Sequence, residues 1–415
     1  MYPRLLLYVA HICLLNVALS KDLDNIIIVF SSGAITATKV PNELRIYYHH
    51  PDFVKGDTLR VYDVEPKSWR EATPRFVKKL KGVSKFVRTG LRAPPPFGMD
   101  KYYAMIIRND TSLKRYSDPG RFHWMEDRKA LIENLSLPNL FIPGTHDSGS
   151  YQRPGKDGIL KNLTANWAIC QDASIYEQLE SGVRFLDIRP ACKKVRGSCN
   201  TFYVNHGPVQ MVPMSQVIHD VDLFLNQTKE IVILSVKQFP SGFDNENDHI
   251  RFMKYLKGEL SRHIFEHSRA KKGWTTPLSE YWSQNKRLII SYTEKDYLDS
   301  ETFWPGIEQR WCNCREFSTL HDFLDSPAKW NSTVVPVADM AELTHNVGSV
   351  VTDLTPLTDN SIRAWADEAG EFIPEWYHEE FNASANIVAV DFLHASGIVD
   401  LAIWWNEKRA QWARR

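Results

Sequence analysis

The sequence predicts an α/β protein in which an all-β, sandwich-like domain precedes a (β/α) barrel. Two observations predict this. Between Asp22 and Trp124, short β-branched and aromatic runs are broken by Pro, Gly and Asp turns, a pattern typical of sandwich domains. After Trp124, apolar strand-like runs alternate with segments of helical periodicity to the end of the chain. The expected domains are residues 21–125 for the sandwich and 126–415 for the barrel, after a signal peptide at 1–20.

The first domain offers no catalytic constellation, so a packing or binding role is the expectation. His49 and His50 stand at a strand end and are interpreted as a loop or strand-end pair rather than as metal ligands. The expected strands of this domain are Ile26–Ser31, Glu43–Tyr48, Thr58–Val64, Lys85–Thr89 and Tyr102–Arg108.

The barrel is marked by apolar strands with amphipathic helices between them. We expect strands at Leu140–Pro143, Val183–Ile188, Phe202–Asn205, Glu230–Val236, Arg287–Tyr292, Val334–Ala338 and Asn386–Phe392. Expected helices are Ser174–Glu180, Met214–Asn226, Asp248–His267 and, at the end, Ile398–Ala413. Helices after Tyr292 are poorly marked, which predicts an irregular barrel there. The last helix carries three Trp residues and is expected to dock on the barrel, with contact to a membrane surface as the alternative.

Composition and the N-terminus set the expected location. Lys plus Arg and Asp plus Glu are both 50, so no charge bias favours nucleic acid as a partner. Arg4, the apolar run Leu5–Leu19 and Ala18-Leu19-Ser20 form a secretory signal with a small-x-small cleavage site. The expectation is a secreted or secretory-lumen protein, with oligomeric state open. Asn-x-Ser/Thr sequons, which fit a glycoprotein, begin at Asn109, Asn134, Asn162, Asn226, Asn331 and Asn382.

Five cysteines remain after Cys13 of the signal, so at least one is unpaired or bridges two chains. Cys192 and Cys199 flank a turn and are the predicted disulfide. Cys312-Asn313-Cys314 resembles part of a metal site, but no second Cys or His pair stands at ligand spacing nearby.

The candidate site gathers polar residues at the ends of five expected strands. His146 and Asp147 follow the first strand, Asp187 and Arg189 end the second, and His206 ends the third. Lys237 follows the fourth strand, and Asp391 lies in the last apolar run. Since catalytic residues of (β/α) barrels come from strand ends at one rim, these groups are expected to meet there.

Their chemistry suits transfer at a phosphate diester. One histidine would take a proton from an attacking hydroxyl, and the other would donate one to the leaving oxygen. Arg189 would brace the phosphate oxygens with its planar fork. Asp391 could orient His146, and Lys237 could bind a hydroxyl or phosphate of the substrate.

Three motifs, in this order and spacing, resemble the X domain of phosphatidylinositol-specific phospholipase C, closest to the bacterial-type enzymes and the animal X-domain-containing proteins. They are Ile142–Ser148, Gln178–Arg189 and Asn205-His206-Gly207. The resemblance covers Asn139–Lys237 strongly and the chain to Asp391 weakly; the N-terminal domain lies outside it.

This resemblance implies a distorted TIM barrel that cleaves phosphatidylinositol to diacylglycerol and inositol 1,2-cyclic phosphate. It implies that His146 is the base, oriented by Asp391, and that His206 is the acid, assisted by Asp147. Arg189 would hold the phosphate, Asp187 would support the site, and Lys237 would contact the head group. Calcium-dependent relatives have a carboxylate where Arg189 stands, so we predict an enzyme without a metal or other cofactor.

Two other functions stay open. A secreted protein could use the same residues to bind a phosphoinositide or glycan without cleaving it. A metal-dependent phosphodiesterase of the glycerophosphodiester or sphingomyelinase D kind shares the barrel, but it needs a carboxylate cluster for its metal. Head-group selectivity is not readable, because only Ser291 and Tyr292 mark the fifth strand.

Overall fold

The structure is a computed structural model that describes residues 26–31, 42–65, 72–92, 102–116, 119–151, 167–328, 334–344, 361–382 and 384–414. The chain forms two compact units. The first comprises Met1–Asp118, Asp367–Ala385 and His394–Gly397, and the second comprises Pro119–Ala366, Asn386–Leu393 and Ile398–Arg415. The predicted signal peptide at 1–20 lies outside the described residues.

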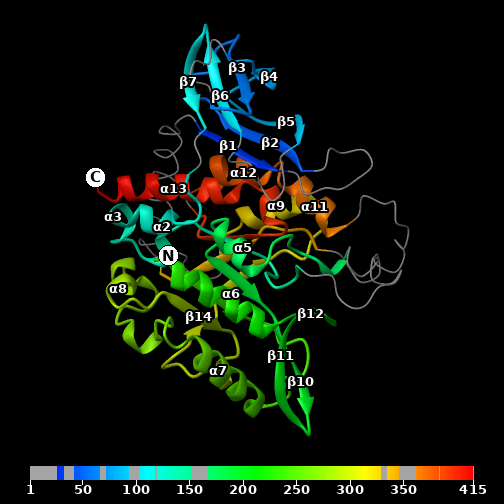
Figure 1. Cartoon of the computed structure of the whole chain (residues 1–415), viewed down its shortest axis with the longest axis vertical. Helices are drawn as coiled ribbons and strands as arrows, with labels where there is room; N and C mark the ends of the chain where they lie inside the picture. Colours follow the sequence, from blue (N-terminus) through cyan, green and yellow to red (C-terminus); the bar gives the residue numbers. More distant parts are fainter. Residues whose placement is uncertain are drawn as a thin grey trace, which may run out of the picture. The chain divides into compact units, whose positions relative to one another are not determined.

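The first unit contains two antiparallel sheets, one of three strands and one of four. All five strands predicted here are present, and the sequence missed the fourth and seventh. Both missed strands, FVKK and TSLKR, have no buried residue, so they lack the apolar pattern that marks a strand. The strand order of the three-stranded sheet is β1 (Ile26–Ser31), β2 (Glu43–His49) and β5 (Ser84–Arg92) (Figure 1). The strand order of the four-stranded sheet is β4 (Phe76–Lys79), β3 (Thr58–Tyr62), β6 (Tyr103–Arg108) and β7 (Thr111–Arg115).

A segment from far along the chain completes this unit. Asp367–Ala385, which the sequence assigned to the barrel, contains the short helix α12 (Ile373–Glu375) and the π-helix η6 (Trp376–Glu380). A buried ion pair fixes the segment to β2, with Arg45 Nη2 2.8 Å from Asp367 Oδ2. Sequence periodicity could not reveal that Asp367–Ala385 belongs to the first unit, because this depends on contacts between residues more than 300 positions apart.

The second unit is built on an eight-stranded sheet in which every pairing is parallel. Its central strands are buried at every position, which explains why they read as unbroken apolar runs rather than alternating ones. The order is β15 (Trp304–Pro305), β14 (Leu288–Tyr292), β13 (Val232–Val236), β9 (Phe185–Ile188), β8 (Ile142–Thr145), β18 (Ile387–Val390), β17 (Val337–Met340) and β16 (Glu308–Trp311).

This sheet confirms the distorted TIM barrel, with two corrections. Among the described residues no pairing joins β15 to β16, so the barrel is open there. The predicted strand Phe202–Asn205 is not a barrel strand. It lies within β11 (Ser198–His206), which pairs antiparallel with β10 (Pro190–Val195) and β12 (Val209–Pro213) beside α7 (Glu246–Leu260) (Figure 1).

The close spacing of the first two barrel strands depends on a glycine. A Cβ at Gly144 of β8 would lie 2.8 Å from Phe185 Cδ1 on β9, which is closer than real contacts allow. Only a residue without a side chain therefore lets these strands pair and align their ends.

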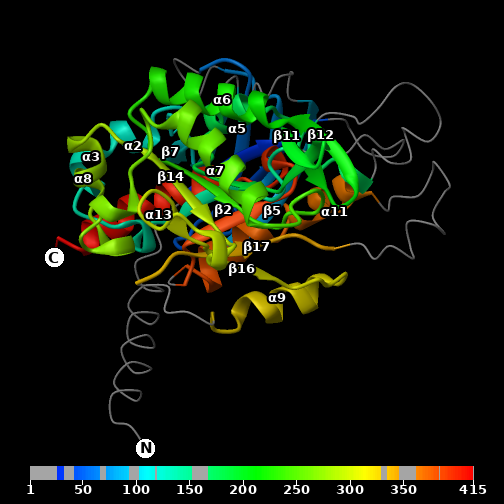
Figure 2. The ribbon, with the colours of Figure 1, turned by 90° about the horizontal axis from the view of Figure 1, so that it is seen from below.

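Helices flank the sheet, as alternation predicted. Ser174 caps α5 (Ile175–Glu180) in a capping box with Glu177. α7 ends at Leu260 rather than at the predicted His267. Figure 2 shows α9 on the side of β16. The remaining helices are α2 (Trp124–Asp127), α3 (Lys129–Ile132), α6 (Met214–Gln227), α8 (Leu278–Ser283), α9 (Phe317–Asp325), α11 (Ile362–Ala369) and α13 (Ile398–Trp412).

The last helix docks within the barrel unit, as predicted. Trp405 of α13 is buried, and Asn406 donates to the carbonyl of Phe141 at 2.7 Å and accepts from its N–H at 2.8 Å. Asp400 forms an ion pair with Arg121 at 2.7 Å. In the part of the chain that the structure describes, no helix has the length and apolar character needed to traverse a bilayer.

Cysteine pairing agrees with the prediction. Cys192 and Cys199 form a disulfide, and so do Cys312 and Cys314, which are therefore not metal ligands. Cys170 is the free, buried cysteine. Among the sequons, Asn162 and Asn331 lie outside the described residues. Asn382 is buried and donates to the carbonyl of His378 at 3.1 Å, so a glycan does not fit on that side chain.

Candidate active site

Strand register brings the polar residues together at one rim. Thr145 at the end of β8 pairs with Val390 of β18 on one side and with Leu186 of β9 on the other. The residues that follow these positions are His146, Asp391 and Asp187. Residues separated by more than 200 positions in the sequence therefore become neighbours at the carboxyl end of the sheet.

His146 is held by Asp391. The distance from His146 Nδ1 to Asp391 Oδ1 is 2.9 Å, and both side chains are buried. A carboxylate accepts only, so it places the proton on Nδ1 and leaves Nε2 as the basic nitrogen. Burial lowers the pKa of His146, but Asp391 and Glu342 outweigh it and leave the pKa raised.

Arg189 sits at the free nitrogen of this histidine. Its Nη2 lies 2.5 Å from His146 Nε2 and 3.4 Å from Asp187 Oδ2, and its Nη1 lies 3.3 Å from Asp147 Oδ2. Burial lowers the pKa of Arg189, yet Asp147 and Asp187 raise it further, so the guanidinium stays charged. The guanidinium is therefore fixed beside His146.

His206 approaches from the antiparallel sheet rather than from a barrel strand. Its Nδ1 donates to the carbonyl of Ala168 at 3.1 Å, which leaves Nε2 3.9 Å from Asp147 Oδ2. Its side chain is 22% exposed, compared with 9% for His146. The two histidines thus flank the same carboxylate and guanidinium, one deep and one nearer the solvent.

Lys237 follows β13 and faces the same charges. Burial lowers the pKa of its ammonium, and Asp187 opposes that effect. Burial would raise the pKa of Asp187, but Lys237 and Arg189 hold it below its usual range. Lys237 Nζ makes no hydrogen bond to another described residue.

The sequence missed three residues of this site. Glu342 follows β17, and burial raises the pKa of its carboxyl beside His146 and Asp391. Gln309 of β16 donates to Asp187 Oδ1 at 3.1 Å. Cys170 Sγ lies 3.9 Å from His206 Nδ1. Glu342 is detectable as a strand-end carboxylate only if the strand continues past the expected end at Ala338, as β17 (Val337–Met340) does. Gln309 lies on a strand without a sequence signal.

The backbone is unusual at three of the strand ends. Asp147, Gln238 and Phe392 have φ of 41°, 47° and 46°, in the left-handed region that side chains disfavour. Each stands directly after a residue of the site, namely His146, Lys237 or Asp391. Such conformations cluster at functional sites, where surrounding structure fixes them. Gln171 supports two of these turns by donating to the carbonyls of His146 and Val390, both at 2.9 Å.

Several buried polar atoms at this rim make no hydrogen bond within the described residues. Buried polar groups are nearly always satisfied, so such a concentration indicates a place for a polar ligand. Asp147 still has its ion pairs with Arg189 and His206. The atoms are both carboxylate oxygens of Asp147, Arg189 Nε, Asn205 Oδ1, Ser291 Oγ and Gln309 Oε1.

Known proteins are similar to this chain in sequence and in fold. No family model matches the chain. PI-PLC X domain-containing protein 1 of Danio rerio is 26% identical over 221 residues, covering 49% of this chain and 69% of the relative. Variant-surface-glycoprotein phospholipase C of Trypanosoma brucei brucei is 26% identical over 230 residues, covering 49% of this chain and 62% of the relative. Phosphatidylinositol-specific phospholipase C of Listeria monocytogenes superposes with a TM-score of 0.51 at 19% identity, covering 68% of this chain and 98% of that one.

The chain resembles the PI-PLC X domain-containing proteins.

Two groups in this PI-PLC X-like barrel have the composition of metal sites. They are His146, Cys170 and Asp391, and Asp147, Cys170 and His206, each with ligand atoms within 4.8 Å of one another. Each group contains a residue in contact with Arg189, His146 in the first and Asp147 in the second, and the charge of Arg189 repels a cation at short range. The donor set therefore suits a metal less well than an anion.

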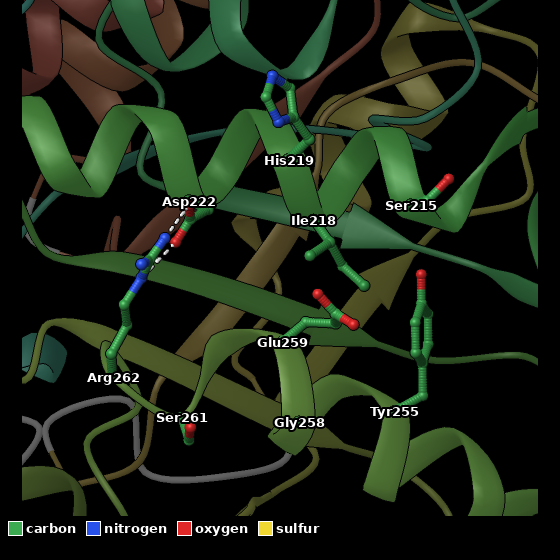
Figure 3. Close-up of a pocket in the computed structure, with 9 residues that line it drawn as sticks. All are labelled: Ser215, Ile218, His219, Asp222, Tyr255, Gly258, Glu259, Ser261 and Arg262. Carbon is green, nitrogen blue, oxygen red and sulfur yellow. Dashed lines mark hydrogen bonds and ion pairs between the residues drawn. The ribbon is translucent and has the colours of Figure 1, made fainter.

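A pocket of about 500 Å³ lies elsewhere on the PI-PLC X-like barrel, between α6 and α7 (Figure 3). His219 and Asp222 lie on one side, Tyr255 and Glu259 on the other, and Arg262 is paired with Asp222. Since it contains none of the strand-end residues, it is not the candidate active site.

Proposed function

We propose that the barrel cleaves an inositol phosphodiester by the phospholipase C reaction, without a metal ion. The observation that carries this proposal is the arrangement around Arg189: a carboxylate-oriented histidine at one end, a second histidine beside Asp147 at the other, and a guanidinium between them. The likeness to PI-PLC X domain-containing proteins supports the substrate class.

The proposed reaction begins with a movement of Arg189. Its Nη2 leaves His146 Nε2 and binds a phosphate oxygen, which frees the basic nitrogen. His146 Nε2 then takes the proton of the inositol 2-hydroxyl, and the oxygen attacks phosphorus. Protonation of Asp391 is not required, because it only orients the ring and stabilises the imidazolium.

The bond from phosphorus to the glycerol oxygen then breaks. His206, protonated on both nitrogens, donates its Nε2 proton to that oxygen, with Asp147 stabilising the cation. Arg189 stabilises the charge on the phosphoryl oxygens, an effect commonly worth about 3–4 kcal/mol per donor. The products are diacylglycerol and inositol 1,2-cyclic phosphate. Lys237 contacts the inositol phosphate head.

Labelled phosphatidylinositol vesicles test the proposal, with the purified chain and His146→Ala side by side. We expect release of cyclic inositol phosphate by the wild type alone, unchanged in excess chelator. A glycosylated inositol anchor and a soluble inositol phosphodiester form two further arms that identify the natural substrate class. Binding of the vesicles without release from any substrate would support a lipid-binding protein instead. Strict calcium dependence would contradict the metal-free mechanism.

We also propose that the protein is exported through the secretory pathway. Two disulfides, Cys192–Cys199 and Cys312–Cys314, support an oxidising compartment. Deleting residues 1–20 should retain the chain inside expressing eukaryotic cells, whereas the full chain should reach the medium. Equal retention of both would contradict the signal peptide.

A further inference from the structure

We propose that the first unit contains a zinc-type divalent cation site formed by His49, His378 and Glu379. The three ligand atoms lie within 4.8 Å of one another. Nothing in this proposal depends on the phospholipase C reaction, because all three residues belong to the first unit and none to the barrel rim.

Sheet geometry places one part of the site. Tyr47 and His49 are two apart on β2, so their side chains share a face. Ser84 of β5 pairs with His49 in register, and its Oγ lies 2.6 Å from His49 Nδ1. These contacts fix the ring of His49, and its Nδ1 lies 3.3 Å from Glu379 Oε1. A zinc ion bound at His49 Nδ1 would therefore replace the contact with Ser84 Oγ.

The other part comes from the π-helix η6, which presents His378 and Glu379 as adjacent residues. In an α-helix neighbouring side chains diverge by about 100°. Here both converge on Tyr47, whose hydroxyl lies 2.9 Å from His378 Nδ1 and 2.9 Å from Glu379 Oε1. π-Helical turns are rare and are frequently found at functional sites, so this geometry is a second indication of a ligand site.

The distance between two of the three ligand atoms matches zinc coordination. Zinc binds imidazole nitrogen and carboxylate oxygen at about 2.0–2.2 Å in a tetrahedron, which separates adjacent ligand atoms by about 3.4 Å. The 3.3 Å between His49 Nδ1 and Glu379 Oε1 agrees with this value. The rings of His49 and His378 lie edge to face with centroids 4.8 Å apart, so both nitrogens can reach one ion. Two imidazoles and one carboxylate leave a fourth position for water or for Tyr47.

Charge and access also suit a cation. The Glu379 carboxylate lies within the cluster, with its Oε1 2.9 Å from the Tyr47 hydroxyl, and supplies negative charge there. The nearby cation Arg45 is neutralised by Asp367 at 2.8 Å. The Glu379 side chain is 31% exposed and that of His49 8%, so an ion can enter from the Glu379 side.

The experiment uses the full purified chain, stripped with a chelator, dialysed and titrated with Zn²⁺. Metal content and calorimetry give the number and affinity of sites. Glu379→Gln and His49→Gln each remove one ligand, and His263→Gln is the matched control because His263 makes a comparable 2.9 Å pair with Asp222 far from this cluster in sequence. We expect each cluster variant to lose one zinc equivalent or to bind it at least about tenfold more weakly, and the control to match the wild type.

X-ray absorption of the zinc-loaded wild type decides the ligands without any variant. The expected spectrum has nitrogen and oxygen neighbours, with scattering from two imidazole rings and none from sulfur. A sulfur neighbour would place the ion at Cys170 in the barrel and overturn the proposal. Wild type and variants with equal zinc content and affinity, or a wild type that binds none, would equally overturn it and leave the cluster as a hydrogen-bonded network.

Discussion

Arg189 Nη2 lies 2.5 Å from His146 Nε2, at the ring nitrogen that Asp391 does not contact. In this arrangement the group proposed to bind phosphate covers the proposed base. Under the proposed mechanism, His146 acts only after the guanidinium has moved to a phosphate, so binding of the diester and release of the base are one event. This coupling would protect a buried histidine from acting on water when no substrate is bound.

Arg189→Gln should therefore affect both binding and pH dependence. The positive charge of Arg189 lowers the pKa of His146, so its removal should raise that pKa further and move the acidic limb of kcat/KM to higher pH. Loss of the phosphate contact should reduce kcat/KM by about 10²–10³. The measurement is a pH–rate profile of cyclic inositol phosphate release. Arg262→Gln, which changes a surface pair with Asp222, is the control and should leave the profile unchanged.

Asp391→Asn should move the profile in the opposite direction. The carboxylate of Asp391 raises the pKa of His146, so the amide should lower it and shift the acidic limb to lower pH. Activity should fall by about 10²–10⁴, because the amide cannot hold the same tautomer. NMR titration of His146 gives the pKa directly. An unchanged or increased pKa in the variant would show that Asp391 does not control this ring.

Glu342→Gln should stabilise the protein more at pH 8 than at pH 4. Burial raises the folded-state pKa of Glu342, so its contribution to stability is present below the unfolded pKa, near 4.5, and is lost as pH rises through the folded pKa. An uncharged Gln avoids that loss. Thermal unfolding at both pH values should show a gain of a few degrees in Tm at pH 8 only. Glu259→Gln, at an exposed position, should show no such difference.

Glu230→Ala should be among the most destabilising single changes in the barrel. Glu230 is fully buried, lies 2.6 Å from Arg184 Nη2, and accepts from the N–H groups of Met125 and Glu126. Removing it leaves an uncompensated buried guanidinium, which typically costs about 3–5 kcal/mol. Chemical denaturation measures the loss. Glu266→Ala breaks the exposed pair with Arg269 and should cost less than about 1 kcal/mol.

The strand ends that carry His146, Asp187, Arg189, Lys237 and Asp391 could be predicted from sequence, because buried parallel strands are long apolar runs with abrupt polar ends. The sequence predicts His206 as a site residue but places it on a parallel barrel strand, whereas it lies on the antiparallel strand β11. The reason is that an apolar run does not reveal which strand it pairs with. Gln309 could not be predicted as a site residue, because its strand β16, with the sequence EQRW, has no apolar pattern.

In the first unit, too, the strands could be predicted from sequence but the contacts between distant residues could not. Its strong strands were predictable, but His49 was interpreted as a strand-end residue without a ligand role. The residues proposed to share a cation site with it, His378 and Glu379, lie more than 300 positions away, on a helix whose π geometry has no sequence signature.

By itself the sequence determined the barrel, six of the eight strands of its sheet, the Cys192–Cys199 disulfide and most of the polar residues at the strand ends. Local periodicity and residue type carry that information. Only the tertiary structure decided which of these residues touch. The register between β8 and β18 sets Asp391 on Nδ1 of His146, and the turn after β9 sets Arg189 on Nε2. Such contacts depend on how distant segments pair, and no short stretch of sequence contains that information.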